Sequence, residues 1–205
     1  SFENRNIGFG AGWSMRMSSY TSTTHTLSLS SGVTYRAYTN GSEVTLADKK
    51  LETINVYVDN DVWVIQHKDG TVEELSRSDS DDNEWLPSRI YSTEGRYISF
   101  LYSRIQGRRV VREVRDAHHC LIKFEYESDN NWSSQPGFTL WPDSAHHKRK
   151  FIFIIRDSWL RQIRMLSRDG FEDAHWMFDY QPSENGGPLI THMQTPLGAV
   201  ETLRY

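Results

Sequence analysis

A short ending that recurs along the chain constrains the fold more than any other feature of the sequence. Each copy is a large apolar residue, one further residue and a tyrosine, and each closes a stretch with the pattern of a β-hairpin: Phe100–Tyr102, Phe124–Tyr126, Phe178–Tyr180 and Leu203–Tyr205. The first two tyrosines lie 24 residues apart and the last two lie 25 apart. A hairpin that returns at nearly constant spacing predicts a repeat architecture, in which each unit buries one face against its neighbours.

Turn signals stand at matching places within these units. Gly95, His119 and Gly198 each lie seven residues before the closing tyrosine. A further hairpin is indicated by Lys68-Asp69-Gly70, since glycine tolerates the positive φ angle that tight hairpin turns require. The glycines at 70, 95 and 198 are therefore predicted turn positions.

Alternation of apolar and polar residues predicts β-strands through most of the chain. The predicted strands are 14–20, 24–29, 33–38, 51–58, 62–66, 71–75, 85–91, 96–102, 109–115, 120–126, 151–155, 160–166, 172–180, 189–193 and 199–205. No stretch combines a helical period with helix caps. We therefore expect an all-β chain of consecutive antiparallel β-hairpin repeats that form a curved or spiralling sheet.

The sequence divides into four parts by its character. Residues 1–60 are a leading segment with a Gly-rich stretch and the first strands, and residues 61–126 carry β-hairpin repeats. Residues 127–150 read as a loop insertion rich in Asn, Ser and Pro, and residues 151–205 carry further hairpins. Within this framework, we expect Gly70, Gly95 and Gly198 to permit turns while the strand-ending aromatics pack adjacent units. Those aromatics are Phe100, Tyr102, Phe124, Tyr126, Phe178, Tyr180 and Tyr205.

The Gly-rich stretch ends in Gly12-Trp13-Ser14, and Gly8, Gly10 and Gly12 occupy alternate positions. Alternate glycines leave one edge of the backbone without side chains, so another strand or a Trp ring can approach closely. The stretch lacks the spacing and the following helix of a nucleotide-binding loop. We therefore interpret Gly12 and Trp13 as packing positions.

Composition and charge exclude several classes of protein. The net charge is −4 with acidic and basic residues interspersed, so there is no basic footprint for nucleic acid. Cys120 is the only cysteine and cannot form a disulfide within the chain. No apolar run of 18 residues predicts a membrane span. The chain starts without Met and without a signal pattern, and we expect it to be a piece of a longer polypeptide.

The acidic stretch 79–84 is the strongest candidate for a cation site. Asp79, Asp81 and Asn83 fall at alternate positions, as in a calcium loop. However, Glu84 stands where the sharp turn needs Gly, and Ile90 stands where the loop needs its last Glu. These two departures favour a solvated acidic loop, and calcium binding is left open.

Other constellations of reactive residues are weak. His118-His119-Cys120 offers too few ligands on one face of a strand to complete a tetrahedral metal site. Glu73 and Glu74 point to opposite faces of a strand and cannot act as a catalytic pair. We predict no catalytic residues, no cofactor and no metal. Trp132 and Trp141 in the insertion are the candidates for surface contact, because Trp suits half-buried interfaces.

Taken together, these features resemble the core of RHS/YD-repeat proteins, the family that includes bacterial polymorphic toxins and the insecticidal toxin-complex C components. Gly8–Ser14 resembles the Gly-Trp-Ser stretch that precedes the family's repeats, and Val62–Leu75 resembles its strand, Asp-Gly, strand unit. The four tyrosine-ended hairpins resemble its repeats. The resemblance covers roughly residues 7–205 outside the insertion. It departs from the family in lacking the Tyr-Asp dipeptide and the C-terminal self-cleavage segment, so that activity is not carried over.

The resemblance implies a non-enzymatic structural scaffold. It implies part of a shell that encapsulates or presents a C-terminal toxin or effector in a secreted or cell-surface bacterial protein, cytoplasmic before delivery. The implied partners are the remainder of the same polypeptide, with further repeats and the toxin domain, and delivery-machinery proteins. Two alternatives stay open: a carbohydrate- or protein-binding β module that uses residues 127–150, and a glycan hydrolase, for which the sequence offers no pair of carboxylates.

Overall fold

A computed structural model describes residues 9–10, 13–47, 54–80, 82–105, 107–126, 136–167, 172–182 and 188–204. All regular secondary structure in these residues is β-strand, and every pairing whose register is given is antiparallel, which confirms the all-β prediction. None of the described residues forms a helix that is long and apolar enough to span a membrane.

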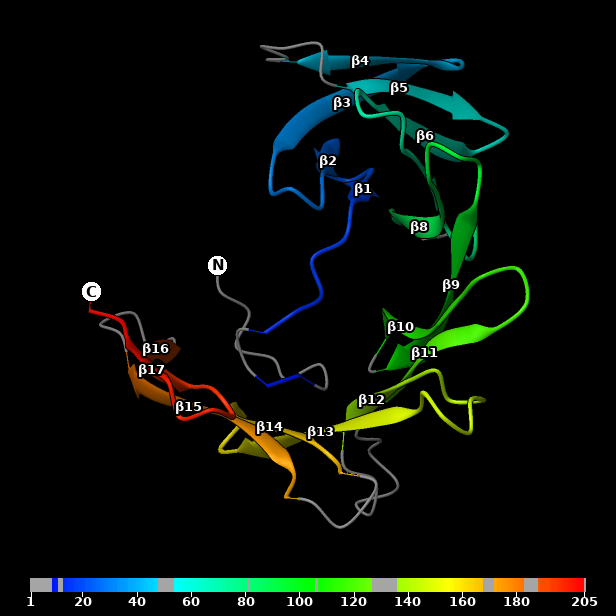
Figure 1. The fold of residues 1–205 in the computed structure, drawn as a ribbon. Helices are drawn as coiled ribbons and strands as arrows, with labels where there is room; N and C mark the ends of the chain where they lie inside the picture. Colours follow the sequence, from blue (N-terminus) through cyan, green and yellow to red (C-terminus); the bar gives the residue numbers. More distant parts are fainter. Residues whose placement is uncertain are drawn as a thin grey trace. The chain divides into compact units, whose positions relative to one another are not determined.

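The strands follow one another along the chain with short connections (Figure 1). They are β1 (Ser19–Thr21), β2 (Thr26–Ser28), β3 (Thr34–Asn40), β4 (Glu43–Ala47), β5 (Ile54–Asp59), β6 (Val62–His67), β7 (Val72–Ser76), β8 (Glu84–Tyr91), β9 (Tyr97–Ile105), β10 (Arg108–Arg115), β11 (Cys120–Glu125), β12 (Gly137–Leu140), β13 (Arg149–Arg156), β14 (Trp159–Met165), β15 (Ala174–Pro182), β16 (Pro188–Gln194) and β17 (Val200–Thr202).

Contacts group the chain into two units, which we describe separately. The barrel unit contains Met15–Leu101 and Val114–His118. The open-sheet unit contains Ser1–Ser14, Tyr102–Glu113 and His119–Tyr205. The open-sheet unit is therefore discontinuous in sequence, because nearly all of the barrel unit lies between its first segment and its strands.

The first eight strands form a closed barrel. Each strand from β1 to β8 pairs with the next one, and β8 returns to β1 through the register pair Tyr20↔Trp85. Closure leaves no free sheet edge in this ring, and at eight strands the interior is narrow enough for side chains to fill it. The sequence predicts the hairpins of this region but not their closure.

Apolar side chains from the inward faces of the strands fill the barrel. The buried core consists of Tyr20, Leu27, Leu29, Ala37, Ile54, Val56, Trp63, Ile65, Leu75 and Trp85. At its centre the rings of Tyr20 and Trp63 stack with centroids 3.7 Å apart, and the Trp63 side chain is 2% exposed. The period-2 alternation of the sequence thus places one apolar row per strand inside the barrel.

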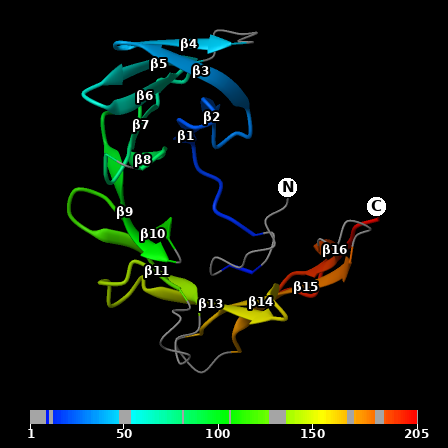
Figure 2. The same cartoon turned by 180° about the vertical axis from the view of Figure 1, so that it is seen from behind.

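The open-sheet unit is a succession of strands from β10 to β17, in which each strand is hydrogen-bonded to the next. Figure 2 shows β13, β14, β15 and β16 in this order. Its core gathers around Phe153, Leu160 and Phe178, with partly buried apolar side chains packed against them. β12 arises from Gly137–Leu140, which the sequence assigns to a loop insertion. A short strand at Glu43–Ala47, which the sequence does not predict, forms β4.

Candidate functional site

The described residues of the Gly-rich stretch pack on one face of the open-sheet unit. We call the five ring residues that they contact the aromatic face: Phe124, Tyr126, Phe153, Phe178 and Tyr180. The Phe9 ring lies 6.2 Å from the Phe124 ring, 5.6 Å from the Tyr126 ring and 5.4 Å from the Phe153 ring, measured between centroids. The leading segment therefore covers apolar surface that belongs to strands far downstream.

Trp13 covers the other end of the aromatic face. Its ring lies edge-on to Phe178 with centroids 5.1 Å apart. Its Nε1–H donates to the Tyr180 hydroxyl at 2.8 Å, and the Tyr180 hydroxyl donates to the Leu160 carbonyl at 2.6 Å. Burial raises the pKa of Tyr180 above its usual range, although the Trp13 hydrogen bond acts in the opposite direction. The phenol is thus held neutral and hydrogen-bonded on both sides.

Tyr126 makes the equivalent contact one repeat earlier. Its hydroxyl donates to the Val111 carbonyl at 2.7 Å, and burial raises the pKa of the phenol. Two of the repeat-closing tyrosines, Tyr126 and Tyr180, therefore reach back to a backbone carbonyl 15 and 20 residues earlier. A buried hydroxyl with a partner stabilises the packing, whereas one without a partner would cost free energy.

Gly10 lies where another backbone approaches. A Cβ atom at this position would be 2.6 Å from the Leu160 amide nitrogen, and the φ angle of Gly10 is +89°. The close approach predicted for the Gly-rich stretch is confirmed at this residue. Gly137 is tighter still, since a Cβ atom there would lie 2.0 Å from the Phe151 carbonyl oxygen. Both positions require glycine for steric reasons.

The remaining repeat positions have varied surroundings. Gly70, Gly95 and Gly198 have φ angles of +88°, +77° and +82°, as expected for turn glycines. Phe100 is half-buried, and the Arg109 guanidinium lies over the Tyr102 ring at 4.5 Å. Three predicted positions, Gly12, Tyr205 and Trp132, lie outside the described residues.

Trp141, the other predicted surface tryptophan, is 48% exposed. It directly follows β12 and has a φ angle of +43°. Its backbone N–H donates to the Leu121 carbonyl at 2.7 Å, and its carbonyl accepts from Ser144 at 3.0 Å. The backbone around this exposed ring is therefore fixed by hydrogen bonds.

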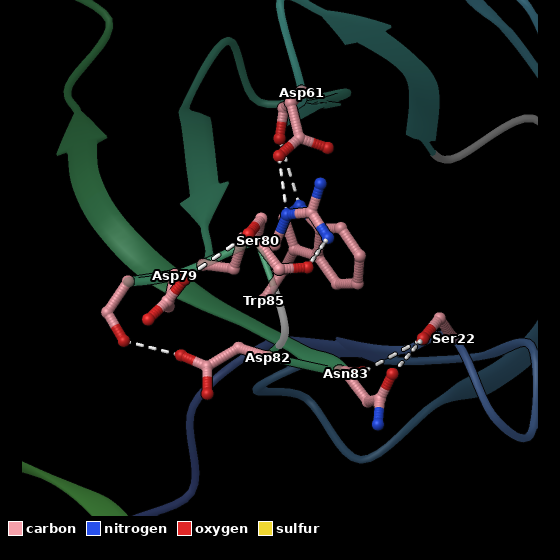
Figure 3. A network of polar contacts seen from close by, with 9 residues as sticks. Ser22, Asp61, Asp79, Ser80, Asp82, Asn83 and Trp85 are labelled. Carbon is pink, nitrogen blue, oxygen red and sulfur yellow. Dashed lines mark hydrogen bonds and ion pairs between the residues drawn. The ribbon is translucent and has the colours of Figure 1, made fainter.

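A polar network surrounds the loop between β7 and β8 (Figure 3). Arg77 donates from Nε to Asp61 Oδ2 at 2.6 Å and from Nη1 to the Ser80 carbonyl at 2.6 Å. The Arg77 guanidinium also lies 4.8 Å from the centre of the Trp85 ring, whose Nε1–H donates to the Asp61 carbonyl at 2.9 Å. One arginine thus joins the β5–β6 turn to the acidic loop.

The acidic side chains of this loop are engaged with serines. Asp82 accepts from the Ser78 hydroxyl, and Asp79 accepts from the Ser80 hydroxyl at 3.3 Å. Asp81 lies outside the described residues. No group of three or more His, Cys, Asp or Glu side chains in the described part of the chain is placed to hold a metal ion. Asp79 and Asp82 are thus both hydrogen-bonded to serine hydroxyls.

In the barrel, the buried carboxylate of Glu73 is hydrogen-bonded to a histidine. Glu73 faces inward opposite Ile65 and is 5% exposed, and its carboxylate lies 2.7 Å from Nε2 of His67. Burying a carboxylate is costly unless it is hydrogen-bonded, so His67 compensates it. Glu74 lies on the opposite face, with its carboxylate 3.8 Å from the Arg89 guanidinium. The two adjacent carboxylates therefore do not act together, as their positions on a strand predict.

The sequence did not reveal the two polar arrangements of the barrel, Arg77–Asp61 and His67–Glu73. Residues 67 and 73 flank the predicted Asp-Gly turn, and the hairpin register places them diagonally on the same face of the two strands, because Glu73 pairs with Ile65. Cys120 is buried, and its sulfur lies 3.5 Å from the Ile122 carbonyl.

No family model matches the chain, and neither does any curated protein sequence.

Proposed function

We propose that the chain is a non-enzymatic structural scaffold, part of an RHS-type shell that encapsulates or presents a toxin or effector. In this proposal the shell belongs to a secreted or cell-surface bacterial protein, and the partner is the remainder of the same polypeptide. Isolation of the cargo comes from a continuous wall rather than from a reaction. The proposal rests on the resemblance of the repeats and on the packing of their closing tyrosines with Phe9 and Trp13.

The observation that carries the proposal is the pair of tyrosine contacts in the open-sheet unit. Tyr126 and Tyr180 each end a hairpin, and each donates to a carbonyl of an earlier strand. Their rings pack in the same cluster as Phe9 and Trp13. Each hydrogen bond joins the two strands of its own hairpin, and the Phe9 ring, which contacts both Tyr126 and Phe153, links neighbouring hairpins. Such contacts suit a wall that must not open between its strands.

The test uses the natural polypeptide that carries this sequence, isolated from its source. We expect a mass far above the 23.9 kDa of this chain and an enclosed segment that resists added protease. The double variant Tyr126→Ala with Tyr180→Ala should loosen the wall and expose that segment to cleavage. Gly41→Ala is the matched control, because it strains a turn at φ +63° but has open space around it.

Two results would contradict the scaffold proposal. One is a natural polypeptide of about the size of this chain, which would leave nothing to enclose. The other is a downstream segment that is cut at the same rate in the wild-type protein and in the tyrosine variant.

A second candidate function, a carbohydrate- or protein-binding module, is favoured by Trp141. Its 48% exposed ring stands on a hydrogen-bonded turn, and aromatic faces of this kind stack against sugars and proteins. The Trp141→Ala variant should then lose binding on a glycan array while keeping its fold. Met177→Ala, at a residue that is 44% exposed on β15, is the control. Equal binding of both variants would remove this candidate.

A further inference from the structure

A pocket of about 680 Å³ lies in the open-sheet unit, between the β12–β13 loop and the facing ends of β14 and β15. Its described lining consists of His146, Arg149, Met165, Leu166, Ser167, Glu172 and Ala174. The volume falls in the range of small-molecule sites, which span roughly 300–1,000 Å³. Trp141 is not among these lining residues.

One wall of the pocket is the β12–β13 loop, which its own hydrogen bonds hold in place. The Ser144 hydroxyl accepts from the backbone N–H of His146 at 3.3 Å and of His147 at 3.0 Å. The Arg149 guanidinium donates from Nη1 to the Lys148 carbonyl at 2.9 Å. The guanidinium is therefore anchored by one nitrogen, and within the described residues it has no carboxylate partner.

The opposite wall is formed where β14 ends and β15 begins. Asp173 accepts from the Ser167 N–H at 2.8 Å and forms an ion pair with Arg164. These two contacts lower the pKa of Asp173, the Arg164 hydrogen bond having the larger effect. The backbone N–H of Leu166 donates to the Lys150 carbonyl at 2.9 Å and joins this wall to β13. The walls are thus set by hydrogen bonds between described residues.

The charges on the two walls are opposite in sign. Arg149, the first residue of β13, supplies a cation, and Glu172, two residues before β15, supplies a carboxylate. The neighbouring Asp173 is already neutralised by Arg164, whereas Glu172 forms no ion pair with the described residues. Met165, Leu166 and Ala174 add apolar lining. A guanidinium recognises a carboxylate, and a carboxylate recognises an ammonium group.

We infer that this pocket binds a short peptide with free ends and an aliphatic side chain. The peptide carboxylate would contact Arg149, its ammonium group would contact Glu172, and the side chain would lie against Met165 and Leu166. This inference does not depend on the scaffold proposal, because it uses only the lining of the pocket.

The test is a titration of the ¹⁵N-labelled full chain with L-leucyl-L-leucine, followed by NMR. We expect saturable shifts of the amides of residues 165–167 and 172–174. Two matched probes remove one charge each: N-acetyl-leucyl-leucine lacks the ammonium group, and leucyl-leucine amide lacks the carboxylate. Each should bind about tenfold more weakly, since a charge-assisted hydrogen bond contributes about 1.5 kcal/mol or more.

Two variants assign each end of the probe to its residue. Arg149→Gln should abolish the preference for the free acid over the amide, while the preference for the free amine persists. Glu172→Gln should do the reverse. The controls are Arg156→Gln, at the exposed other end of β13, and Glu201→Gln on β17, and neither should change any affinity.

The amide spectrum of each variant reports whether it keeps its fold. If Arg149→Gln disturbs the spectrum widely, Arg149→Lys replaces it; because Lys keeps the charge but lacks the planar fork, the preference for the free acid should then become smaller rather than vanish. The inference is overturned if leucyl-leucine produces no saturable shifts up to 50 mM, a concentration well above the roughly millimolar affinities of weak ligands. It is also overturned if the three probes bind equally, or if neither variant changes the order of their affinities.

Discussion

The barrel unit and the open-sheet unit are both built from antiparallel hairpins, but their edges and their cores are completed differently. In the barrel, β8 returns to β1, and every strand contributes to a core that residues 20–85 supply by themselves. In the open-sheet unit no pairing between β10 and β17 is found among the described residues, and its aromatic face is covered by Phe9 and Trp13. A chain of hairpins can thus bury its apolar face either by closing into a barrel or by packing a segment from far along the sequence against it.

The largest expected effect comes from the centre of the barrel. Trp63→Ala should destabilise the barrel by about 3–5 kcal/mol, because a fully buried ring that stacks on Tyr20 is replaced by a cavity. Chemical denaturation, with hydrogen exchange read strand by strand, measures the loss. Trp141→Ala removes the same side chain from an exposed position and should cost far less. A loss below about 1 kcal/mol for Trp63→Ala would contradict the packed interior.

The contribution of the N-terminal segment that carries Phe9 and Trp13 to the open-sheet unit is tested by Trp13→Ala. We expect a loss of about 2 kcal/mol, since the ring is half-buried and its removal also leaves the Tyr180 hydroxyl without one partner. Hydrogen exchange should become faster in β14 and β15. Met15→Ala, two residues further along at a 37% exposed position, is the control. Unchanged exchange in β14 and β15 would show that this segment does not stabilise the sheet.

A smaller loss of stability is expected when only the hydroxyl of Tyr126 is removed and its ring is kept. Tyr126→Phe keeps the ring and loses the bond to the Val111 carbonyl, which should cost about 1 kcal/mol at neutral pH. Because burial raises the pKa of Tyr126, the unfolded chain loses this proton first, and wild-type stability falls as pH rises above about 10. The variant should show a weaker fall. Tyr38→Phe, at an exposed tyrosine, is the control, and an equal alkaline fall in both variants would refute the assignment.

The smallest expected effect is a gain in stability from a substitution in a turn. Ser158 in the β13–β14 turn has a φ angle of +66°, which is unfavourable for a residue with a side chain. Ser158→Gly should therefore stabilise the open-sheet unit by up to about 1 kcal/mol in chemical denaturation. Ser31→Gly is the comparison, because Ser31 is not among the residues with positive φ and should gain nothing. A destabilising Ser158→Gly would contradict the turn geometry.

The local structure could largely be predicted from the sequence. Alternation of apolar residues and the turns at Gly70, Gly95 and Gly198 locate most strands correctly. The turns at 60–61 and 157–158 contain no glycine, although all four residues adopt positive φ. β4 is short and β12 follows a run of turn-forming residues, so neither has a clear alternating pattern.

Long-range relations could not be predicted in the same way. The closure of the barrel depends on only two register pairs between β1 and β8, which are separated by more than 60 residues. The aromatic face was predicted in part, since all of its residues except Phe153 were expected to pack adjacent units. Its contacts with Phe9 and Trp13 follow from no spacing rule. The pocket joins His146 and Arg149 to residues 165–167 and to Glu172 and Ala174, and no motif in these stretches marks it as a site.

The contact between Trp13 and Tyr180 also affects the order in which the chain can fold during synthesis. The two residues are 167 positions apart, and a ribosome adds about 5–20 residues per second. Trp13 therefore leaves the ribosome about 8–33 s before its partner does, while residues 20–85 can already close around their own core. During synthesis, Phe9 and Trp13 therefore emerge well before the strands that will bury them.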